Sequence, residues 1–258
     1  MRAKLGQNFL IDVEWQRKIV EAFDPPEEFG EIGPGKGAIT THLLEKFDRP
    51  FVVFELDRNL AAIHRQQARY ATIEGNFLDW DFRLGGMDVH NFSLIGNLPY
   101  ESASMMLLRV AERVAQLNTC VFLVQREVAE RVTAEPHTRD FSSFTVLLQG
   151  QFYWEALHVI PPEAFQPAPE VYSQLIRATP RPESERHPQA VPYKKFLQSS
   201  FLHKRKTFRN ALKSRFEAAV IDQVIEEFEL KPTVRAEEIP ADIWPRLFIA
   251  FERRTHGQ

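Results

Sequence analysis

Apolar, β-rich segments alternate with helical patterns along most of this chain, and this alternation limits the possible folds more than any other feature. The segments cover residues 28–32, 51–55, 71–74, 92–95, 119–124, 152–160 and 171–177. Strands separated by helices predict a parallel, doubly wound α/β sheet. Residues 161–169 join the last two segments without a helical pattern, so the final pair of strands is expected to be antiparallel.

A segment rich in proline and charge separates this pattern from the rest of the chain. Residues 179–188 (Thr-Pro-Arg-Pro-Glu-Ser-Glu-Arg-His-Pro) contain few apolar side chains, which is typical of a linker. The pattern after the linker is helical to the end. We therefore expect an α/β domain over residues 1–179 and a small all-helical domain over residues 180–258.

Composition excludes several classes of protein. The chain has 258 residues, a formal net charge of −3 and no apolar run near the roughly 20 residues of a membrane span. Residues 1–4 lead into polar sequence rather than a signal peptide, so we expect a cytoplasmic protein without a membrane partner, and we expect it to be a monomer. The single cysteine, Cys120, excludes a disulfide within the chain and a cysteine metal site, and no metal is expected.

Positive charge is concentrated in the C-terminal part. From Pro180 onward there are 15 Lys and Arg against 11 Asp and Glu, whereas the preceding part has 17 against 24. Phe208, Leu212 and Phe216 recur at every fourth position, which predicts a helix with one apolar face. Eight cations occur here with no acid among them: Lys194, Lys195, Lys204, Arg205, Lys206, Arg209, Lys213 and Arg215. Such a cluster indicates either a solvated helix face or a phosphate-binding surface.

Asn97-Leu98-Pro99-Tyr100 follows the fourth apolar segment directly. The carboxyl ends of strands are where open α/β sheets bind ligands. The Asn97 amide oxygen can accept a hydrogen bond, Pro99 restricts Leu98 to extended conformations, and Tyr100 offers a stacking face. The tetrapeptide indicates either a pocket for an exocyclic amine or a proline turn that ends a strand.

A glycine-rich turn follows the first predicted strand. Residues 31–37 read Glu-Ile-Gly-Pro-Gly-Lys-Gly, and glycines at such a turn let a ligand approach the backbone. Residues 30–36 also fit the G-x-x-x-x-G-K phosphate loop, but Gly37 replaces the hydroxyl residue that Mg²⁺ needs, which argues against a nucleoside triphosphatase. Glu55 ends the next strand, and its carboxylate suits a ribose diol. Together these features predict a nucleoside cofactor.

Six motifs occur here in a family-specific order. They are Gly-Gln-Asn-Phe-Leu at 6–10, Glu-Ile-Gly-Pro-Gly at 31–35, Glu-Leu-Asp-Arg at 55–58, Asn-Leu-Pro-Tyr at 97–100, Gln-Arg-Glu-Val-Ala-Glu-Arg at 125–131 and Lys-Arg-Lys-Thr-Phe-Arg-Asn-Ala-Leu at 204–212. In these motifs the chain resembles the KsgA family of ribosomal RNA small subunit (16S) adenine N6,N6-dimethyltransferases. The resemblance implies a Rossmann-like, S-adenosylmethionine-dependent methyltransferase sheet of seven strands, the last one antiparallel, followed by a small helical rRNA-binding domain.

The resemblance also implies which residues hold the cofactor. These are Asn8, Leu10, Gly33, Gly35, Glu55, Asn76 and Asn97. The family carries an Asp where this chain has Asn76, and a neutral amide is a weaker acceptor than a carboxylate. A shifted role for the nearby Asp79 is the alternative.

The target base is implied to bind beside the cofactor. The Asn97 side-chain oxygen and the Leu98 carbonyl would accept from the adenine amine, and Tyr100 would stack on the base. Phe165, in the Phe-x-Pro-x-Pro stretch, is expected on the opposite face; its alternative is a core position beneath the proline loop.

The expected RNA contacts lie mainly in the helical domain. They are Lys204, Arg205, Lys206, Arg209 and Lys213. Two departures from the family pattern remove positive charge: residues 141–145 (Phe-Ser-Ser-Phe-Thr) lack an expected arginine, and Glu170 replaces a usual lysine.

The resemblance therefore implies dimethylation of two adjacent adenosines in 16S rRNA, with 16S rRNA in the small subunit as the partner and a role in subunit biogenesis. One alternative is the related 23S rRNA methyltransferase of the macrolide-resistance type, which usually has Ile at the position of Leu98. Another is a non-catalytic assembly factor with the same fold, against which the retained Asn97 and Tyr100 argue.

Overall fold

The computed structural model describes residues 8–203 and 205–256 and divides the chain into two compact units. The first unit comprises the chain up to Ala129 together with Phe152–Pro180. The second unit comprises Glu130–Gln151 and the chain from Arg181 onward. Residues 130–151 thus belong to the second unit, although they precede the linker in sequence. The reason is packing: Phe141 and Val146 are buried in the same apolar cluster as Tyr193 and Trp244.

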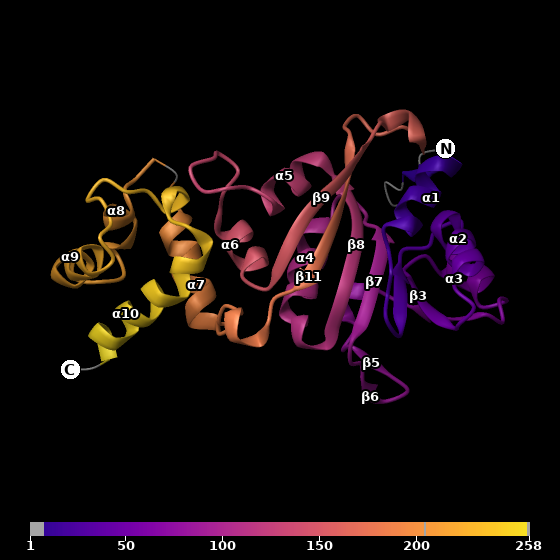
Figure 1. Ribbon diagram of the computed structural model, residues 1–258, viewed down its shortest axis with the longest axis horizontal. Helices are drawn as coiled ribbons and strands as arrows, with labels where there is room; N and C mark the ends of the chain where they lie inside the picture. Colours follow the sequence, from indigo (N-terminus) through magenta and orange to yellow (C-terminus); the bar gives the residue numbers. More distant parts are fainter. Residues whose placement is uncertain (1–7, 204, 257–258) are drawn as a thin grey trace. The chain divides into compact units, whose positions relative to one another are not determined.

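A seven-stranded sheet forms the centre of the first unit, with the order β4-β3-β2-β7-β8-β11-β9. Its strands are β2 (Phe29–Ile32), β3 (Phe51–Glu55), β4 (Tyr70–Glu74), β7 (Phe92–Asn97), β8 (Leu117–Gln125), β9 (Phe152–Ile160) and β11 (Ser173–Pro180). The first five are parallel, whereas β11 is antiparallel to both β8 and β9 (Figure 1). This confirms the expected seven strands with an antiparallel last strand. The strand order reverses between β2 and β7, where doubly wound sheets bind ligands.

Two short strand pairs escape prediction from the sequence. β1 (Phe9–Leu10) pairs with β10 (Phe165–Gln166), and β5 (Arg83–Leu84) pairs with β6 (Met87–Asp88). Two-residue strands are too short to show a periodic pattern in the sequence. The Gly-Gly turn between β5 and β6 indicates a hairpin, whereas no local feature indicates the pairing of β1 with β10. The β5–β6 hairpin extends from the lower edge of the sheet in Figure 1.

Helices α1 (Val13–Glu21) and α2 (Ala38–Lys46) pack on one face of the sheet. Asp12 caps α1 by accepting hydrogen bonds from two backbone N–H groups of its first turn, at 2.9 and 3.2 Å. The two helices bury Ile19, Val20, Ile39 and Leu43 in one cluster with strand residues. The other helical elements of this unit are α3 (Arg58–His64), η1 (Phe77–Asp79), α4 (Ala103–Glu112), η2 (Val114–Gln116) and η3 (Pro162–Ala164). Helix α5 (Arg126–Val132) passes from the first unit into the second.

The regular elements of the second unit, among its described residues, are all helical. Its elements are α6 (Ser143–Gln149), η4 (Glu183–Glu185), α7 (Val191–Phe201), α8 (Phe208–Leu212), α9 (Ala218–Glu227), η5 (Ala236–Glu238), η6 (Ala241–Ile243) and α10 (Trp244–His256). Trp244 and Phe196 lie at the centre of its core with their ring centroids 6.0 Å apart. Phe208, Leu212 and Phe216 are all buried there, as the fourfold spacing predicts, although α8 itself ends at Leu212.

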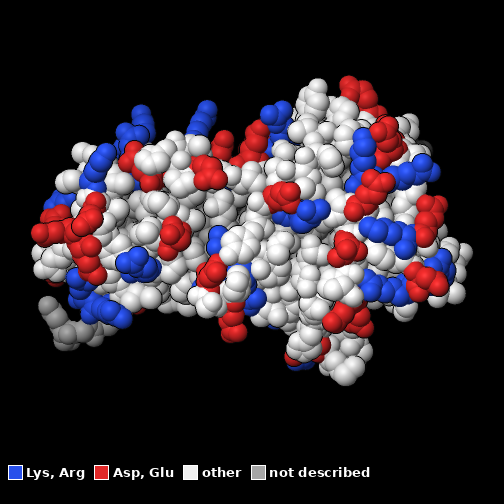
Figure 2. All heavy atoms as spheres, in the orientation of Figure 1, with Lys and Arg blue, Asp and Glu red and all other residues white. Residues whose placement is uncertain are grey.

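Charged side chains are scattered over the face of the molecule that Figure 2 shows. On the part of the first unit that Figure 2 shows, at the right, acidic and basic side chains are interleaved. Across the residues that the structure describes, no helix combines the length and hydropathy needed to cross a membrane.

Candidate active site

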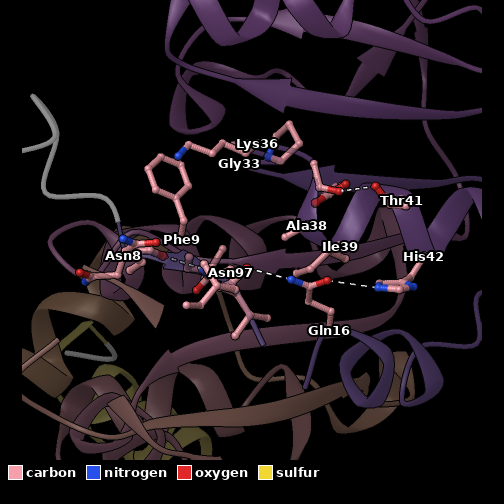
Figure 3. Close-up of a pocket in the computed structure, with 18 of the residues that line it drawn as sticks. Asn8, Phe9, Gln16, Gly33, Lys36, Ala38, Ile39, Thr41, His42 and Asn97 are labelled. Atoms are coloured by element: carbon pink, nitrogen blue, oxygen red, sulfur yellow. Dashed lines mark hydrogen bonds between the residues drawn. The ribbon is translucent and has the colours of Figure 1, made fainter. Parts of the chain in front are cut away.

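A pocket of about 520 Å³ lies where β2, β3 and β7 end. Its lining comes from the segment 8–16, the turn after β2 with the start of the helix that follows it (31–42), Glu55 at the end of β3, residues 97–100, and Gln166 (Figure 3). The residues that the sequence predicts for cofactor and amine binding therefore meet in one cavity, with the exceptions of Phe165 and Asn76.

The glycine turn forms the floor of this pocket. Gly33 and Gly35 have φ angles of 66° and 57°, in the left-handed region that favours glycine. The Gly33 N–H donates to the Phe54 carbonyl at 2.9 Å, which ties the turn to β3. A Cβ atom on Gly35 would lie 3.2 Å from the Phe9 ring, so the N-terminal segment packs closely on the turn. The turn thus offers backbone without side chains to a ligand.

Glu55 is held rigidly at the end of β3. Its side chain is 2% exposed, and its two carboxylate oxygens accept from the backbone N–H groups of Gly35 and Asp57, at 3.0 and 2.9 Å. Each carboxylate oxygen can accept a second hydrogen bond. The carboxylate is therefore fixed in place and retains capacity for a diol.

The Asn97 side chain is oriented by the N-terminal segment. Its Nδ2 donates to the backbone carbonyl of Asn8 at 3.3 Å (Figure 3). The amide oxygen then points away from Asn8, and no hydrogen bond within the described residues engages it. A half-buried acceptor is thus presented in the pocket.

Leu98 and Tyr100 complete this end of the pocket. The Leu98 N–H donates to the Leu123 carbonyl at 3.0 Å, and its side chain is 1% exposed, so its backbone is fixed. Tyr100 is half-buried, with its Oη 2.6 Å from the Ser173 Oγ, and burial raises the pKa of its phenol. Its ring stands at the pocket wall as a neutral aromatic face.

Phe165 does not line the pocket, which corrects the expectation of a second stacking face. The ring is 3% exposed and packs in the core with Leu10 and Ile19. The cause is the pairing of β1 with β10, in which Leu10 lies opposite Phe165. Because side chains alternate along a strand, the neighbouring Gln166 lines the pocket instead.

Asn76 lies outside the pocket, at the start of η1. Its side-chain oxygen accepts from the Leu78 N–H at 3.1 Å and so caps this short helix. The residue is exposed at the carboxyl end of β4. Its cofactor contact stays a prediction, and the same holds for Asp79.

Two polar residues that the sequence did not single out support the N-terminal segment. Gln16 donates through Nε2 to the Leu10 carbonyl at 2.9 Å, and its Oε1 lies 3.2 Å from the Nε2 of His42 (Figure 3). Both side chains line the pocket and are almost fully buried. A polar residue on the buried face of an amphipathic helix was the available signal for Gln16.

His64 supports the glycine turn from behind. Its Nε2 lies 2.9 Å from the Gly35 carbonyl and its Nδ1 2.7 Å from the Tyr70 Oη. A carbonyl only accepts, so Nε2 is the donor. No sequence motif marks this residue, because its partners are distant along the chain.

Glu31 brings a second carboxyl group to the pocket. It is 1% exposed, and the Thr40 hydroxyl donates to it at 2.6 Å. Burial, with a smaller contribution from the charge of Glu55, raises the pKa of Glu31 to about 8. The group is therefore protonated at neutral pH when the pocket holds no cation.

The side chains expected to contact RNA in the second unit differ in exposure and in ion pairing within the protein. Arg205, Lys206 and Lys213 are exposed, whereas Lys204 lies outside the described residues. Arg209 forms a bidentate ion pair with Asp222, with distances of 2.5 and 2.7 Å. The hydrogen bond from Arg209 lowers the pKa of Asp222. The charge of Arg209 is thus already compensated within the protein.

The altered stretch at residues 141–145 is largely structural. Phe141 and Phe144 are buried, and Ser142 with Thr145 forms a capping box at the start of α6. The guanidinium of Arg131 lies over the Phe144 ring, 4.7 Å from its centroid.

Comparisons with known proteins agree with this site. The model of the ribosomal RNA adenine dimethylase family matches residues 1–253. The chain belongs to this family. It is 37% identical to ribosomal RNA small subunit methyltransferase A of Dechloromonas aromatica (strain RCB), over 95% of this chain and 96% of the relative. It is also 37% identical to the protein of that name from Acidobacterium capsulatum, over 98% and 92%.

Solved structures show the same fold. A dimethyladenosine transferase from Plasmodium falciparum superimposes with a TM-score of 0.80 and 18% identity, covering 96% of this chain and 98% of the other. The 23S rRNA methyltransferase ErmE gives 0.69 and 21%, covering 95% and 100%. Family membership and fold confirm the resemblance, the Rossmann-like methyltransferase sheet, the adenine dimethyltransferase activity and the use of S-adenosylmethionine.

The pocket of this ribosomal RNA adenine dimethylase fits that cofactor. Glu55 has acceptor capacity that suits ribose hydroxyls, the glycine turn leaves its backbone open, and Asn97 lines the same cavity. Glu55 provides a carboxyl group for a sulfonium ligand, and Glu31 provides a second one, whose ionised form a bound cation would favour. When bound, the cofactor supplies an electrophilic methyl group.

Proposed function

We propose that this protein dimethylates the N6 atoms of two adjacent adenosines in 16S rRNA of the small ribosomal subunit, and so contributes to subunit biogenesis. It acts in the cytoplasm as a monomer. Residues 1–179 serve as the methyltransferase domain and residues 180–258 as the rRNA-binding domain, with residues 130–151 packed into the helical unit. The observation that carries the proposal is the meeting of Asn97, Leu98 and Tyr100 with the glycine turn and Glu55 in one pocket.

The chain's own residues explain how an unreactive amine is prepared. The lone pair of the adenine amine is delocalised into the ring, so the nitrogen must become pyramidal to attack. The Asn97 Oδ1, turned away from Asn8, and the Leu98 carbonyl accept from the amine and hold its lone pair toward the methyl donor. These hydrogen bonds strengthen as positive charge develops on the nitrogen.

Tyr100 receives the face of the target base. An adenine must leave its stack to enter the pocket, and an aromatic platform compensates for the lost stacking. The hydrogen bond between Tyr100 and Ser173 fixes the ring. The buried Leu98 side chain and the bond from its N–H to Leu123 keep the two acceptors at a constant separation.

Methyl transfer to isolated subunits tests the proposal. The protein is incubated with labelled S-adenosylmethionine and unmethylated small or large subunits, and the product is mapped by primer extension. We expect label in two adjacent adenosines of small subunits. Label only in large subunits indicates the 23S enzyme, and label in neither indicates an assembly factor; both results refute the proposal.

Asn97→Ala tests the role of the amide. We expect at least a hundredfold loss of methyl transfer, as for removal of one transition-state acceptor in other enzymes, with subunit binding retained. Asn59→Ala changes an exposed asparagine of α3 and serves as the control. Wild-type turnover by Asn97→Ala would refute the amine-acceptor role.

A further inference from the structure

Lys36 is a cation that lines the pocket and is separate from the groups proposed to bind the adenine amine and the ribose. It lies in the glycine turn and extends toward the N-terminal segment, with its Nζ 4.6 Å from the centroid of the Phe9 ring (Figure 3). The side chain is exposed, and no carboxylate among the described residues pairs with it. Within the described part of the chain its ammonium group contacts the aromatic face of Phe9, which is a weak partner at an exposed site.

The other titratable side chains of the pocket supply no second ammonium or guanidinium group. Glu31 and Glu55 are acids, and Glu55 already accepts from two backbone N–H groups. The remaining basic ring, His42, lies between the oxygens of Glu45 and Gln16. Of the described residues that line the cavity, Lys36 alone offers an ammonium group to a ligand.

The methionyl part of the cofactor carries both an ammonium and a carboxylate. The acids and the backbone carbonyls of the pocket can receive the ammonium, whereas the carboxylate needs a cation or N–H donors. Lys36 and Phe9 belong to the turn and to the N-terminal strand, the two segments that close on each other at Gly35. The Phe9 ring thus holds the ammonium of Lys36 at the pocket wall before a ligand arrives.

We infer that Lys36 binds the α-carboxylate of S-adenosylmethionine and makes the pocket selective for ligands that carry this group. The ion pair replaces the contact between Lys36 and Phe9, because a charge-assisted hydrogen bond is stronger than an exposed cation–π contact. The inference rests on the proposed function for the identity of the ligand. Lys36, which in the sequence fits only an incomplete phosphate-loop motif, would then distinguish ligands with the carboxylate from ligands without it.

A thermodynamic cycle between residue and ligand tests the inference. Isothermal titration calorimetry measures the dissociation constants of S-adenosylmethionine and of decarboxylated S-adenosylmethionine, which keeps the sulfonium and the ammonium but lacks the carboxylate. Both ligands are titrated into the wild type, Lys36→Met and Lys36→Arg. Lys231→Met, an exposed lysine of the second unit, is the control for a change of one charge.

We expect the wild type to prefer S-adenosylmethionine by about tenfold, and Lys36→Met to lose this preference by weakening only the carboxylated ligand. Lys36→Arg should keep part of the preference, and Lys231→Met all of it. Equal affinities of Lys36→Met and the wild type for both ligands, or an equal loss for both, would overturn the inference. So would a selective loss of small-subunit binding, which would make Lys36 an RNA phosphate contact. Failure of the wild type to bind either ligand would instead refute the proposed function together with the inference.

Discussion

Single residues in this pocket owe their chemistry to their hydrogen-bond partners. The amide nitrogen of Asn97 donates to the carbonyl of Asn8, which leaves the amide oxygen available as an acceptor. Glu55 is fixed because two backbone N–H groups donate to its carboxylate oxygens. Glu31 differs, since burial with one hydroxyl donor leaves its charged form poorly stabilised. These three side chains thus present an oriented amide, an anion and a neutral acid within one cavity.

The raised pKa of Glu31 predicts a pH-dependent stability. In the unfolded chain the group ionises near 4.5, whereas in the folded protein it ionises near about 8. Between these values the folded state binds more protons than the unfolded state, so stability falls as pH rises, by at most about 1.4 kcal/mol per pH unit. Glu31→Gln keeps an acceptor for Thr40 and removes this penalty. Its melting temperature relative to the wild type should therefore rise from pH 5 to pH 8 in cofactor-free protein.

Thermal unfolding across this range, followed by circular dichroism, checks the prediction. Glu28→Gln, which changes an exposed glutamate just before β2, should give a constant difference from the wild type. A pH-independent difference for Glu31→Gln would show that Glu31 is ionised in the folded protein.

At the scale of elements, the site depends on how closely β2 and β7 approach each other. Gly96 lies opposite Ile32, and a Cβ atom on Gly96 would stand 2.6 Å from the Ile32 carbonyl oxygen. This approach sets Asn97 beside the turn that starts at Gly33. Backbone atoms cannot move aside as a flexible side chain can, so the strands would have to separate.

Gly96→Ala should therefore destabilise the protein by about 2–3 kcal/mol and weaken cofactor binding together with it. Urea unfolding and calorimetric titration measure the two effects. Ser93→Ala in the same strand is the matched control, because the buried Ser93 hydroxyl has no hydrogen-bond partner within the described part of the chain. A stable Gly96→Ala with weakened cofactor binding would contradict the coupling.

The elements also show what the sequence can predict. Strand β3 is the continuous apolar run at residues 51–54 followed by Glu55, so its bounds can be predicted from the sequence, with Glu55 as the last residue. Strands β1 and β10 have two residues each, and only their pairing in space buries Phe165 and turns Gln166 to the pocket. Gln16, His42 and His64 act through partners far away in sequence, which no local pattern reveals. Motifs thus identify groups that touch a ligand better than the groups that position them.

At the scale of the whole molecule, the parts of the chain before and after residue 180 differ in net charge. The first part of the chain has an excess of acids, whereas the part from residue 180 has an excess of bases. A polyanion is therefore expected to be attracted mainly by the second unit, through cations that no acid neutralises. Ion pairing within the protein determines which cations are available to RNA. Arg205, Lys206 and Lys213 are exposed, whereas Arg209 forms an ion pair with Asp222.

Salt dependence of small-subunit binding tests this division. The logarithm of the affinity falls linearly with the logarithm of the salt concentration, and each phosphate contact makes this slope steeper by roughly 0.7–0.9. The triple variant Arg205→Gln, Lys206→Gln and Lys213→Gln should lower the slope by about 2 and weaken binding at low salt, because it removes three uncompensated charges. Its affinity for S-adenosylmethionine should not change, since none of the three residues lines the pocket.

Arg209→Gln provides the contrast within the same helix region. Because Asp222 already compensates this arginine, its loss should change the slope by less than one phosphate contact, whereas Asp222→Asn should raise the slope by freeing the guanidinium. Filter binding over a series of salt concentrations measures all three variants under identical conditions. If Arg209→Gln lowers the slope as much as the triple variant does, the ion pair opens on the RNA and Arg209 is the principal phosphate contact. If the triple variant leaves the slope unchanged, the phosphate-binding surface lies outside these three cations.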